Sequence, residues 1–177
     1  MCKQLTSRVN ALSKISWSAD FQTRKMVANA LIMSRIVYVI QLYGNATDYL
    51  LKSLQVLQNK AARTVTRSGW RTETSGLLRQ IGWLSVKQLV VYHNLLLVFK
   101  IIRDGKPGYL SEKLKKDFSY RTRQATGNCL VVQGTPDSDS KQTAFVHRTT
   151  ILWNKLPYNV RNLQVFLKFK YEVKNWV

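Results

Sequence analysis

The residues best suited to chemistry in this chain are basic side chains with a tryptophan among them. Lys60, Arg63 and Arg67 recur at helical spacing. Arg71 follows in the next few residues, with Trp70 beside it. Basic side chains along one helix face can contact successive phosphates of a nucleic-acid backbone, and an exposed aromatic ring can stack on a base. The sequence therefore predicts that these five residues bind nucleic acid.

A second basic cluster surrounds a predicted stacking residue, Tyr120. Its predicted nucleic-acid-binding members are Lys113, Lys115, Lys116, Arg121 and Arg123. In a protein of average charge, both clusters would be better interpreted as solvated surface. Here 28 Lys and Arg residues stand against 9 Asp and Glu residues, a formal net charge of +19, and solubility alone does not require such an excess. The charge therefore predicts a polyanionic partner: RNA, DNA or an RNA–DNA hybrid.

The acidic residues form no catalytic pattern. Polymerisation of nucleotides requires two or more Asp residues that hold Mg²⁺ against phosphates, whereas the six Asp residues here are scattered. Asp137 and Asp139 are the one close pair. Together with Pro136 and Lys141 they superficially resemble a restriction-type nuclease motif, but that fold needs a strand and a turn between the two halves. A solvated loop is the better interpretation, and the chain is predicted not to be an enzyme by itself.

The cysteine and histidine residues predict no metal site, no catalytic residue and no cofactor. Cys2 and Cys129 are too far apart for a Cys-x₂-Cys ligand pair, and too few for a disulfide framework. His93 falls in an apolar segment, which favours a core or core-edge imidazole, and His147 adjoins Arg148 on a basic face. The first residues lack the apolar segment of a secretion signal. A nuclear or cytoplasmic location is therefore expected.

Hydrophobic periodicity predicts the helices that position the first basic cluster. Residues 21–43 are predicted to form a helix with Asp20 as its N-cap. Its apolar stripe contains Met26, Ala30, Met33, Val37 and Ile40, and it is widened by Ile32, Ile36 and Val39. A second predicted helix extends from about residue 48 to residue 67. Its apolar side contains Leu50, Leu54, Leu57, Ala61 and Val65, and its polar side contains Lys52, Asn59, Lys60, Arg63 and Arg67.

Later helices are predicted over residues 72–81, 85–103, 142–156 and 163–176. Gly82 is the predicted cap of the first of these, and Ser85 is the predicted start of the next. The helix over residues 85–103 is apolar around most of its circumference and is therefore predicted to be the most buried. Core positions, rather than roles in base stacking, are predicted for Trp83, Phe99 and Trp153.

The predicted fold class is mostly α: a multi-helix bundle with one irregular loop region over about residues 119–143. Within that region, residues 129–133 favour β-structure and are the candidate for one short strand. The longest apolar run, residues 26–43, is interrupted by Arg35, whereas a membrane-spanning helix needs about 20 mostly apolar residues. The run is therefore predicted to be a buried core helix, and no membrane partner is expected.

Several segments of the chain follow one another in a characteristic order. They are ALIMSRIVYVIQLYGN at 30–45, LKSLQVLQNKAARTVT at 51–66, LLRQIGWLSVKQLVVYHNLLLVFKII at 77–102, KPGYLSEKL at 106–114, AFVHRTTILWNKLPYNVR at 144–161 and LQVFLKFKYEVKNW at 163–176. In this order they resemble the C-terminal part of the reverse transcriptases of non-LTR (LINE-type) retrotransposons. The resemblance covers nearly the whole chain, from about residue 9.

The resemblance implies an organisation into segments. Residues 1–70 would be thumb-like helices, which follow the polymerase palm and contact the template–primer duplex. Later segments would be a helical C-terminal extension at 71–118, an exposed connection at 119–143 and the C-terminal helices at 144–177. By analogy, Lys60, Arg63 and Arg67 would lie toward the nucleic acid. The sequence departs from the family in that the fingers, the palm and its catalytic Asp residues are missing.

The resulting hypothesis is a non-catalytic, nucleic-acid-binding fragment of a retrotransposon-type RNA-directed DNA polymerase, which binds the template–primer backbone through basic helix faces. One alternative is a stand-alone helical interaction module. Without the palm, its helices would expose an apolar face to the missing palm or to a copy of the chain. Another alternative is a decayed retroelement remnant without catalytic activity. A weaker interpretation is that the helix at 163–176 binds an anionic membrane surface.

Overall fold

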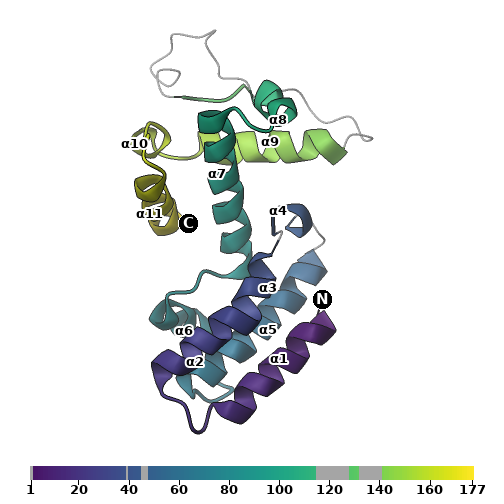
Figure 1. Ribbon diagram of the computed structural model, residues 1–177, viewed down its shortest axis with the longest axis vertical. Coiled ribbons are helices and arrows are strands. Elements are labelled where there is room, and N and C mark those ends of the chain that lie inside the picture. Colours follow the sequence, from purple (N-terminus) through teal and green to yellow (C-terminus); the bar gives the residue numbers. More distant parts are fainter. Residues whose placement is uncertain (1, 39, 45–47, 115–127, 132–140) are drawn as a thin grey trace. The chain divides into compact units, whose positions relative to one another are not determined.

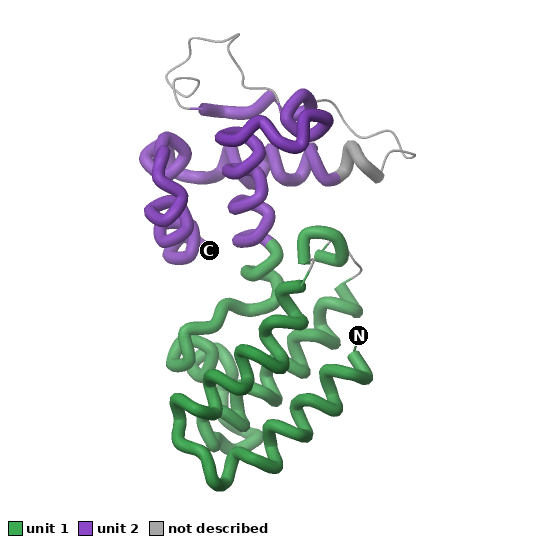
Figure 2. Tube along the Cα trace, viewed as in Figure 1, with its two compact units in different colours: residues 1–90 green, residues 91–177 purple. Residues whose placement is uncertain are grey.

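The structure is a computed structural model that describes residues 2–38, 40–44, 48–114, 128–131 and 141–177. These residues are mostly helical, which confirms the predicted mostly α fold class. The chain divides into two compact units, residues 1–90 and 91–177 (Figure 2). The boundary between the units falls within one long helix, α7 (Val86–Asp104).

In the first unit, helix α5 (Asp48–Thr66) is central, because α1 (Cys2–Ile15), α2 (Phe21–Ala28) and α6 (Thr74–Ile81) all pack on it (Figure 1). The buried face of α5 consists of Leu51, Leu54, Leu57, Gln58, Ala61, Ala62 and Val65. The prediction for the apolar side of this helix is wrong only at its first position. Leu50 is 48% exposed, and Leu51 is buried in its place.

Helix α1 lies in a segment for which no helix was predicted. Leu5, Val9 and Leu12 follow one another at steps of four and three, and all three are buried. The rest of α1 is largely polar. Three apolar residues on one face are enough to attach a short helix to a larger neighbour, because packing rather than intrinsic propensity supplies most of the stability of helices in proteins.

The predicted helix over residues 21–43 begins as expected but does not run unbroken. The carboxylate of Asp20 accepts hydrogen bonds from the backbone N–H groups of Gln22 (3.1 Å) and Thr23 (3.3 Å), which confirms the predicted N-cap. At Tyr38 the backbone leaves the helical region, with φ −58° and ψ 115°. The successive pieces are α2, the π-helical turn η1 (Asn29–Met33), α3 (Ser34–Val37) and α4 (Ile40–Tyr43).

The π-helical turn changes which side chains face the core. A π-turn closes with hydrogen bonds between residues five apart, so it spreads one turn over more residues than an α-helix does. Residues four positions apart along this segment therefore lie on the same side of the helix. The buried row is Ala28, Ile32, Met33, Ile36 and Ile40. The predicted stripe is wrong at Met26, which is 67% exposed, and at Ala30, which is also exposed.

The connection from α6 to α7 forms as the sequence predicts. Gly82 has a φ of +80°, the left-handed conformation that glycine adopts without strain. The backbone N–H of Trp83 then donates to the carbonyl of Leu78 at 2.8 Å, which closes the end of α6. At the start of α7, Ser85 and Gln88 form a reciprocal capping box, each side chain accepting from the backbone N–H of the other.

A buried glutamine of α5 holds this connection in place. Gln58 is fully buried, and its Nε2 donates to the carbonyl of Leu84 at 2.8 Å. Its neighbour on α5, Gln55, accepts from the backbone N–H of Val86 at 2.8 Å. These two hydrogen bonds attach the α6–α7 connection to α5 within the first unit, which extends to residue 90. These hydrogen bonds join residues that lie 26 and 31 positions apart and have no signature in the local sequence.

The second unit is organised around three aromatic side chains. The rings of Phe99 on α7 and Phe169 on α11 (Phe166–Trp176) are stacked with centroids 4.3 Å apart. Trp153 on α9 (Lys141–Asn154) lies 5.6 Å from Phe169, centroid to centroid. These contacts confirm the core positions predicted for Phe99 and Trp153. The remaining helices of the unit are α8 (Gly108–Lys113) and α10 (Tyr158–Arg161).

Part of the predicted loop region 119–143 is ordered by α9. The side-chain amide of Asn154 both accepts from the backbone N–H of Leu130 (3.0 Å) and donates to its carbonyl (2.9 Å). The indole N–H of Trp153 donates to the carbonyl of Asn128 at 2.7 Å. Within residues 128–131 no regular strand forms, and residues 119–127 and 132–140 lie outside the described residues. Residues 141–143 are helical rather than part of a loop.

His93 lies at the edge of the core of the second unit, as predicted. Burial, and then the nearby ammonium group of Lys170, lower the pKa of His93 below its usual value of 6.5. The unfolded chain therefore binds a proton at this position more readily than the folded chain. The contribution of neutral His93 to the free energy of unfolding is present above the unfolded pKa and is lost as the pH falls through the lowered pKa.

We expect the thermal midpoint of unfolding to be lower at pH 5.5 than at pH 7.5, and the substitution His93→Gln to reduce this difference. Differential scanning calorimetry at the two pH values would measure it. The chain has two histidines, so His147→Gln serves as the comparison variant. An identical pH dependence in the wild type and in His93→Gln would contradict the assignment.

Candidate nucleic-acid interface

The outward face of α5 contains part of the first predicted basic cluster. Lys52 and Lys60 are exposed, and Arg63 is partly buried. The Nε–H of Arg63 is buried and has no hydrogen-bond partner within the described part of the chain. These three cations lie opposite the face that packs on α1, α2 and α6. The arrangement leaves their charges available to a ligand.

Arg67 has a structural role in addition to the predicted one. It is the first residue after α5 and has a left-handed φ of 54°. Its Nη2 donates to the backbone carbonyls of Ser16 (2.8 Å), Trp17 (2.8 Å) and Ala19 (3.3 Å). These carbonyls bear no net charge, so the hydrogen bonds fix the guanidinium group without neutralising it. Binding of phosphate by Arg67 stays a prediction.

A second arginine at the same place was not predicted. Arg24 on α2 is only 6% exposed. Its Nε donates to the carbonyl of Val65 in the last turn of α5 (2.8 Å), and its Nη1 donates to the carbonyl of Ala19 (2.6 Å). No local pattern could have identified it, because in the sequence it is one of several charged residues on an amphipathic helix.

Trp70 and Arg71 continue the cluster beyond α5. Trp70 is 77% exposed, and the guanidinium carbon of Arg71 lies 4.9 Å from the centroid of its ring. This cation–π contact keeps a positive charge on the ring without covering it. Trp70 is thus exposed beside a cation, and its stacking on a base stays a prediction.

The second predicted cluster is only partly described. Lys113 is exposed at the end of α8. Lys115, Lys116, Arg121 and Arg123, together with Tyr120, lie outside the described residues.

Acidic residues do little to offset the charge of the first unit. Residues 1–90 contain 13 Lys and Arg residues and 3 Asp and Glu residues. Asp20 caps α2, and a hydrogen bond from the Thr23 side chain holds its pKa below the usual value. Asp48 pairs with Lys87 at 2.9 Å, and Glu73 accepts a hydrogen bond from Ser75. In the described structure, no carboxylate forms an ion pair with the basic residues of the interface.

A further pair of arginines lines a hollow of about 200 Å³ in the first unit. Arg8 of α1 donates through Nη1 to the carbonyl of Leu31 in η1 at 3.0 Å. Arg35 and the exposed Tyr38 form the other wall. No functional role was predicted for these residues. They lie far apart along the chain and meet only because η1 packs beside α1.

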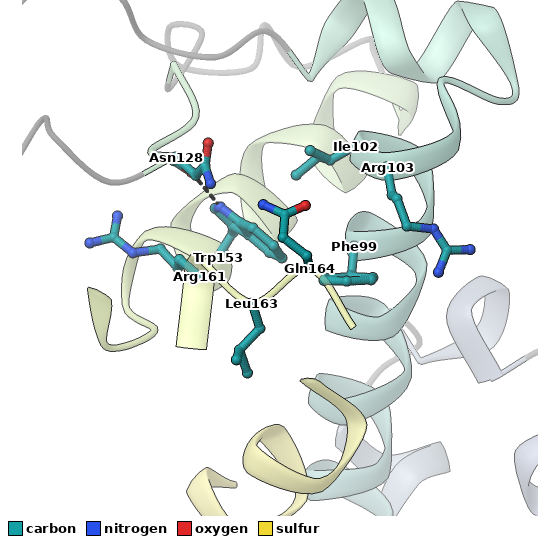
Figure 3. A pocket seen from close by; sticks show the side chains of 8 residues that line it. All are labelled: Phe99, Ile102, Arg103, Asn128, Trp153, Arg161, Leu163 and Gln164. Atoms are coloured by element: carbon teal, nitrogen blue, oxygen red, sulfur yellow. Dashed lines mark hydrogen bonds between the residues drawn. The ribbon is translucent and has the colours of Figure 1, made fainter. Parts of the chain in front are cut away.

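The second unit contains a larger pocket, of about 260 Å³ (Figure 3). Its lining is Phe99, Ile102, Arg103, Asn128, Trp153, Arg161, Leu163 and Gln164. The guanidinium group of Arg103 points away from the ring of Trp153 (Figure 3) and pairs with Asp104 at 2.6 Å. Among the described residues, this lining contains no carboxylate, thiol or imidazole.

Metal-ligand groups and membrane-spanning helices are two further features that bear on function. Among the described residues, no group of three or more His, Cys, Asp or Glu side chains is placed to hold a metal ion. No single helix within these ranges is long and apolar enough to cross a membrane, although the bent pair α6 and α7 taken together meets the criteria of length and composition.

Comparison of the chain with protein-family models, with curated proteins and with solved structures finds no match.

Substitution of Arg24 should show how strongly the arginine contacts stabilise the first unit. Arg24→Met keeps the length and apolar stem of the side chain but removes the donors to Val65 and Ala19. We expect the free energy of unfolding to fall by about 2–3 kcal/mol, the cost of buried carbonyls that lose a charged donor. Arg79→Met, at an exposed position of α6, is the control and should change stability by less than about 0.5 kcal/mol. Urea denaturation would measure both, and equal effects would contradict the role given to Arg24.

Proposed function

We propose that the chain binds nucleic acid through its phosphate backbone, using the outward face of α5 and the basic residues that follow it. The main support for the proposal is that apolar and basic side chains lie on opposite faces of α5. One face is buried against α1, α2 and α6, while Lys52, Lys60 and Arg63 lie on the other. Lys52 interacts electrostatically with Asp48, and among the described residues no carboxylate forms an ion pair with Lys60 or Arg63.

Energetics favour a polyanionic ligand. A formal charge of +19 repels itself in the folded state, and a ligand that supplies many negative charges relieves this repulsion. Binding also releases the counterions condensed on the nucleic acid, so affinity depends steeply on salt. Side chains that reach phosphates carry no sequence information, and binding is proposed to be independent of sequence.

The resemblance to the C-terminal part of LINE-type reverse transcriptases supports the same proposal. A thumb-like position for α5 would bring Lys60 and Arg63 to the template–primer backbone. The proposal assigns no catalytic step to this chain, and the polymerase palm would be a further partner.

The first test compares two double variants of equal charge. Lys60→Ala/Arg63→Ala should weaken binding to a single-stranded RNA and to an RNA–DNA hybrid by about tenfold. It should also lower the slope of log K against log salt concentration by about two, one for each phosphate contact. Fluorescence anisotropy at several salt concentrations would measure both quantities.

Lys168→Ala/Lys174→Ala is the matched control, since both side chains are exposed on α11. It changes the net charge equally but leaves α5 intact. If the two double variants show equal reductions in affinity and in salt slope, binding is spread over the whole basic surface, and the α5 site is refuted. A wild-type chain that binds neither nucleic acid refutes the function itself.

Exposed apolar residues favour a second candidate function, that of an interaction module. Tyr38, Leu42 and Tyr49 are each 70–78% exposed and come from the short stretch between α3 and the first turn of α5. Large exposed apolar side chains mark sites of protein association. This candidate predicts that the chain forms dimers at micromolar concentration and that Leu42→Glu/Tyr49→Glu is monomeric. Sedimentation velocity would measure this, and a monomeric wild-type chain would count against self-association.

A further inference from the structure

Two tryptophans of the first unit are unusually exposed. Trp17 is 84% exposed and Trp70 is 77% exposed, whereas Trp83 and Trp153 are buried. Trp17 lies in the connection between α1 and α2, and Trp70 lies in the connection between α5 and α6. A large apolar ring in water is unfavourable, so two such rings at defined positions point to a ligand.

Arg67 brings the two tryptophans to the same end of the first unit. Its Nη2 donates to the carbonyl of Trp17 and to those on either side of it in the connection, so the loop with Trp17 is attached to the end of α5. Trp70 follows Arg67 by three residues, in a turn closed by a hydrogen bond from the N–H of Thr72 to the carbonyl of Gly69 at 3.1 Å. The two connections meet at one end of the bundle (Figure 1).

Cationic side chains lie on the helix ends and connections that hold the two rings. The cations at this end are Lys14, Arg24, Arg67 and Arg71, and Arg71 lies against the ring of Trp70. Asp20 and Glu73 lie on the same connections, but Asp20 is held as the cap of α2 and Glu73 by Ser75. Indole rings with guanidinium groups beside them suit a ligand that has both flat π-surfaces and phosphates.

We propose that Trp17 and Trp70 form a stacking site for the unpaired bases of a single-stranded nucleic acid, at the carboxyl end of α5. The inference rests on the proposed nucleic-acid-binding function and defines the form of the ligand at this end. The site is continuous with the α5 face, because Lys60 and Arg63 lead along the helix to Arg67. A duplex cannot occupy the rings in the same way, since its bases already stack on one another.

The test compares a 12-nucleotide oligo(dT) with a 12-base-pair DNA duplex as probes, with Trp17→Ala/Trp70→Ala as the variant. We expect binding of the single strand to weaken by at least about 25-fold, from a factor of about five or more for each of the two stacking rings. Binding of the duplex should change less than about twofold, and the salt slope should not change for either probe, because no phosphate contact is removed. Trp17→Tyr/Trp70→Tyr retains aromatic rings and should recover much of the affinity for the single strand.

Trp176→Ala on α11 is the control for loss of a partly exposed tryptophan, and it should leave both affinities unchanged. Quenching of tryptophan fluorescence by oligo(dT) should disappear in Trp17→Ala/Trp70→Ala and persist in Trp176→Ala. Because Trp17 and Trp70 are exposed, circular dichroism should show the same helix content in every variant.

Three outcomes would overturn the proposal. The first is unchanged affinity of Trp17→Ala/Trp70→Ala for oligo(dT). The second is an equal loss for oligo(dT) and duplex. The third is a loss confined to vesicles of 70% phosphatidylcholine and 30% phosphatidylserine, which would assign the tryptophans to a membrane surface. A wild-type chain that binds the duplex but not oligo(dT) also refutes the stacking site while the proposed function stands, whereas failure to bind either probe refutes both.

Discussion

The packing of α1, α2 and α5 in the first unit depends on hydrogen bonds to backbone carbonyls. These carbonyls lie at the carboxyl end of α5 and in the α1–α2 connection. Arg24 and Arg67 supply the donors: Arg24 reaches Val65 and Ala19, and Arg67 reaches the carbonyls around Trp17. The hydrogen bond to the Val65 carbonyl is buried, so this carbonyl would be costly without a donor, and cations near the negative end of a helix dipole are favourable. These contacts join α1, α2 and α5 at one end, so the same hydrogen bonds hold the bundle together and position the exposed rings.

Charged residues therefore serve two purposes in this unit. A backbone carbonyl accepts the hydrogen bond of a guanidinium group and leaves its positive charge in place. A carboxylate would accept the hydrogen bond and also neutralise the charge. The arginines at the end of α5 thus stabilise the fold and still contribute to the positive field around Lys60 and Arg63. The cost is self-repulsion within a unit that has 13 basic and 3 acidic residues, and a polyanionic ligand would offset that cost. Stability and binding are linked in this way, because a ligand that binds the folded chain also stabilises it.

The local signals in the sequence were reliable where the structure depends on neighbouring residues. Asp20, Gly82 and Ser85 act as the predicted caps, because each cap is decided within a few residues of backbone. The core positions of Trp83, Phe99 and Trp153 were also predictable from their apolar surroundings. In contrast, Met26 and Ala30 were predicted to face the core and are exposed, because the π-helical turn η1 alters the helical phase.

The sequence by itself determined the helical content, the caps, the excess of positive charge and the two-sided character of α5. These properties follow from residue type and from spacing along one helix. Only the tertiary structure decided which cations hold the fold and which remain available to a ligand, since Arg24 and Val65 are 41 residues apart and Arg67 and Trp17 are 50 residues apart. It also decided that Trp17 and Trp70 share one end of the unit. Contacts between distant residues depend on how helices pack, and periodicity within each helix contains no information about its neighbours.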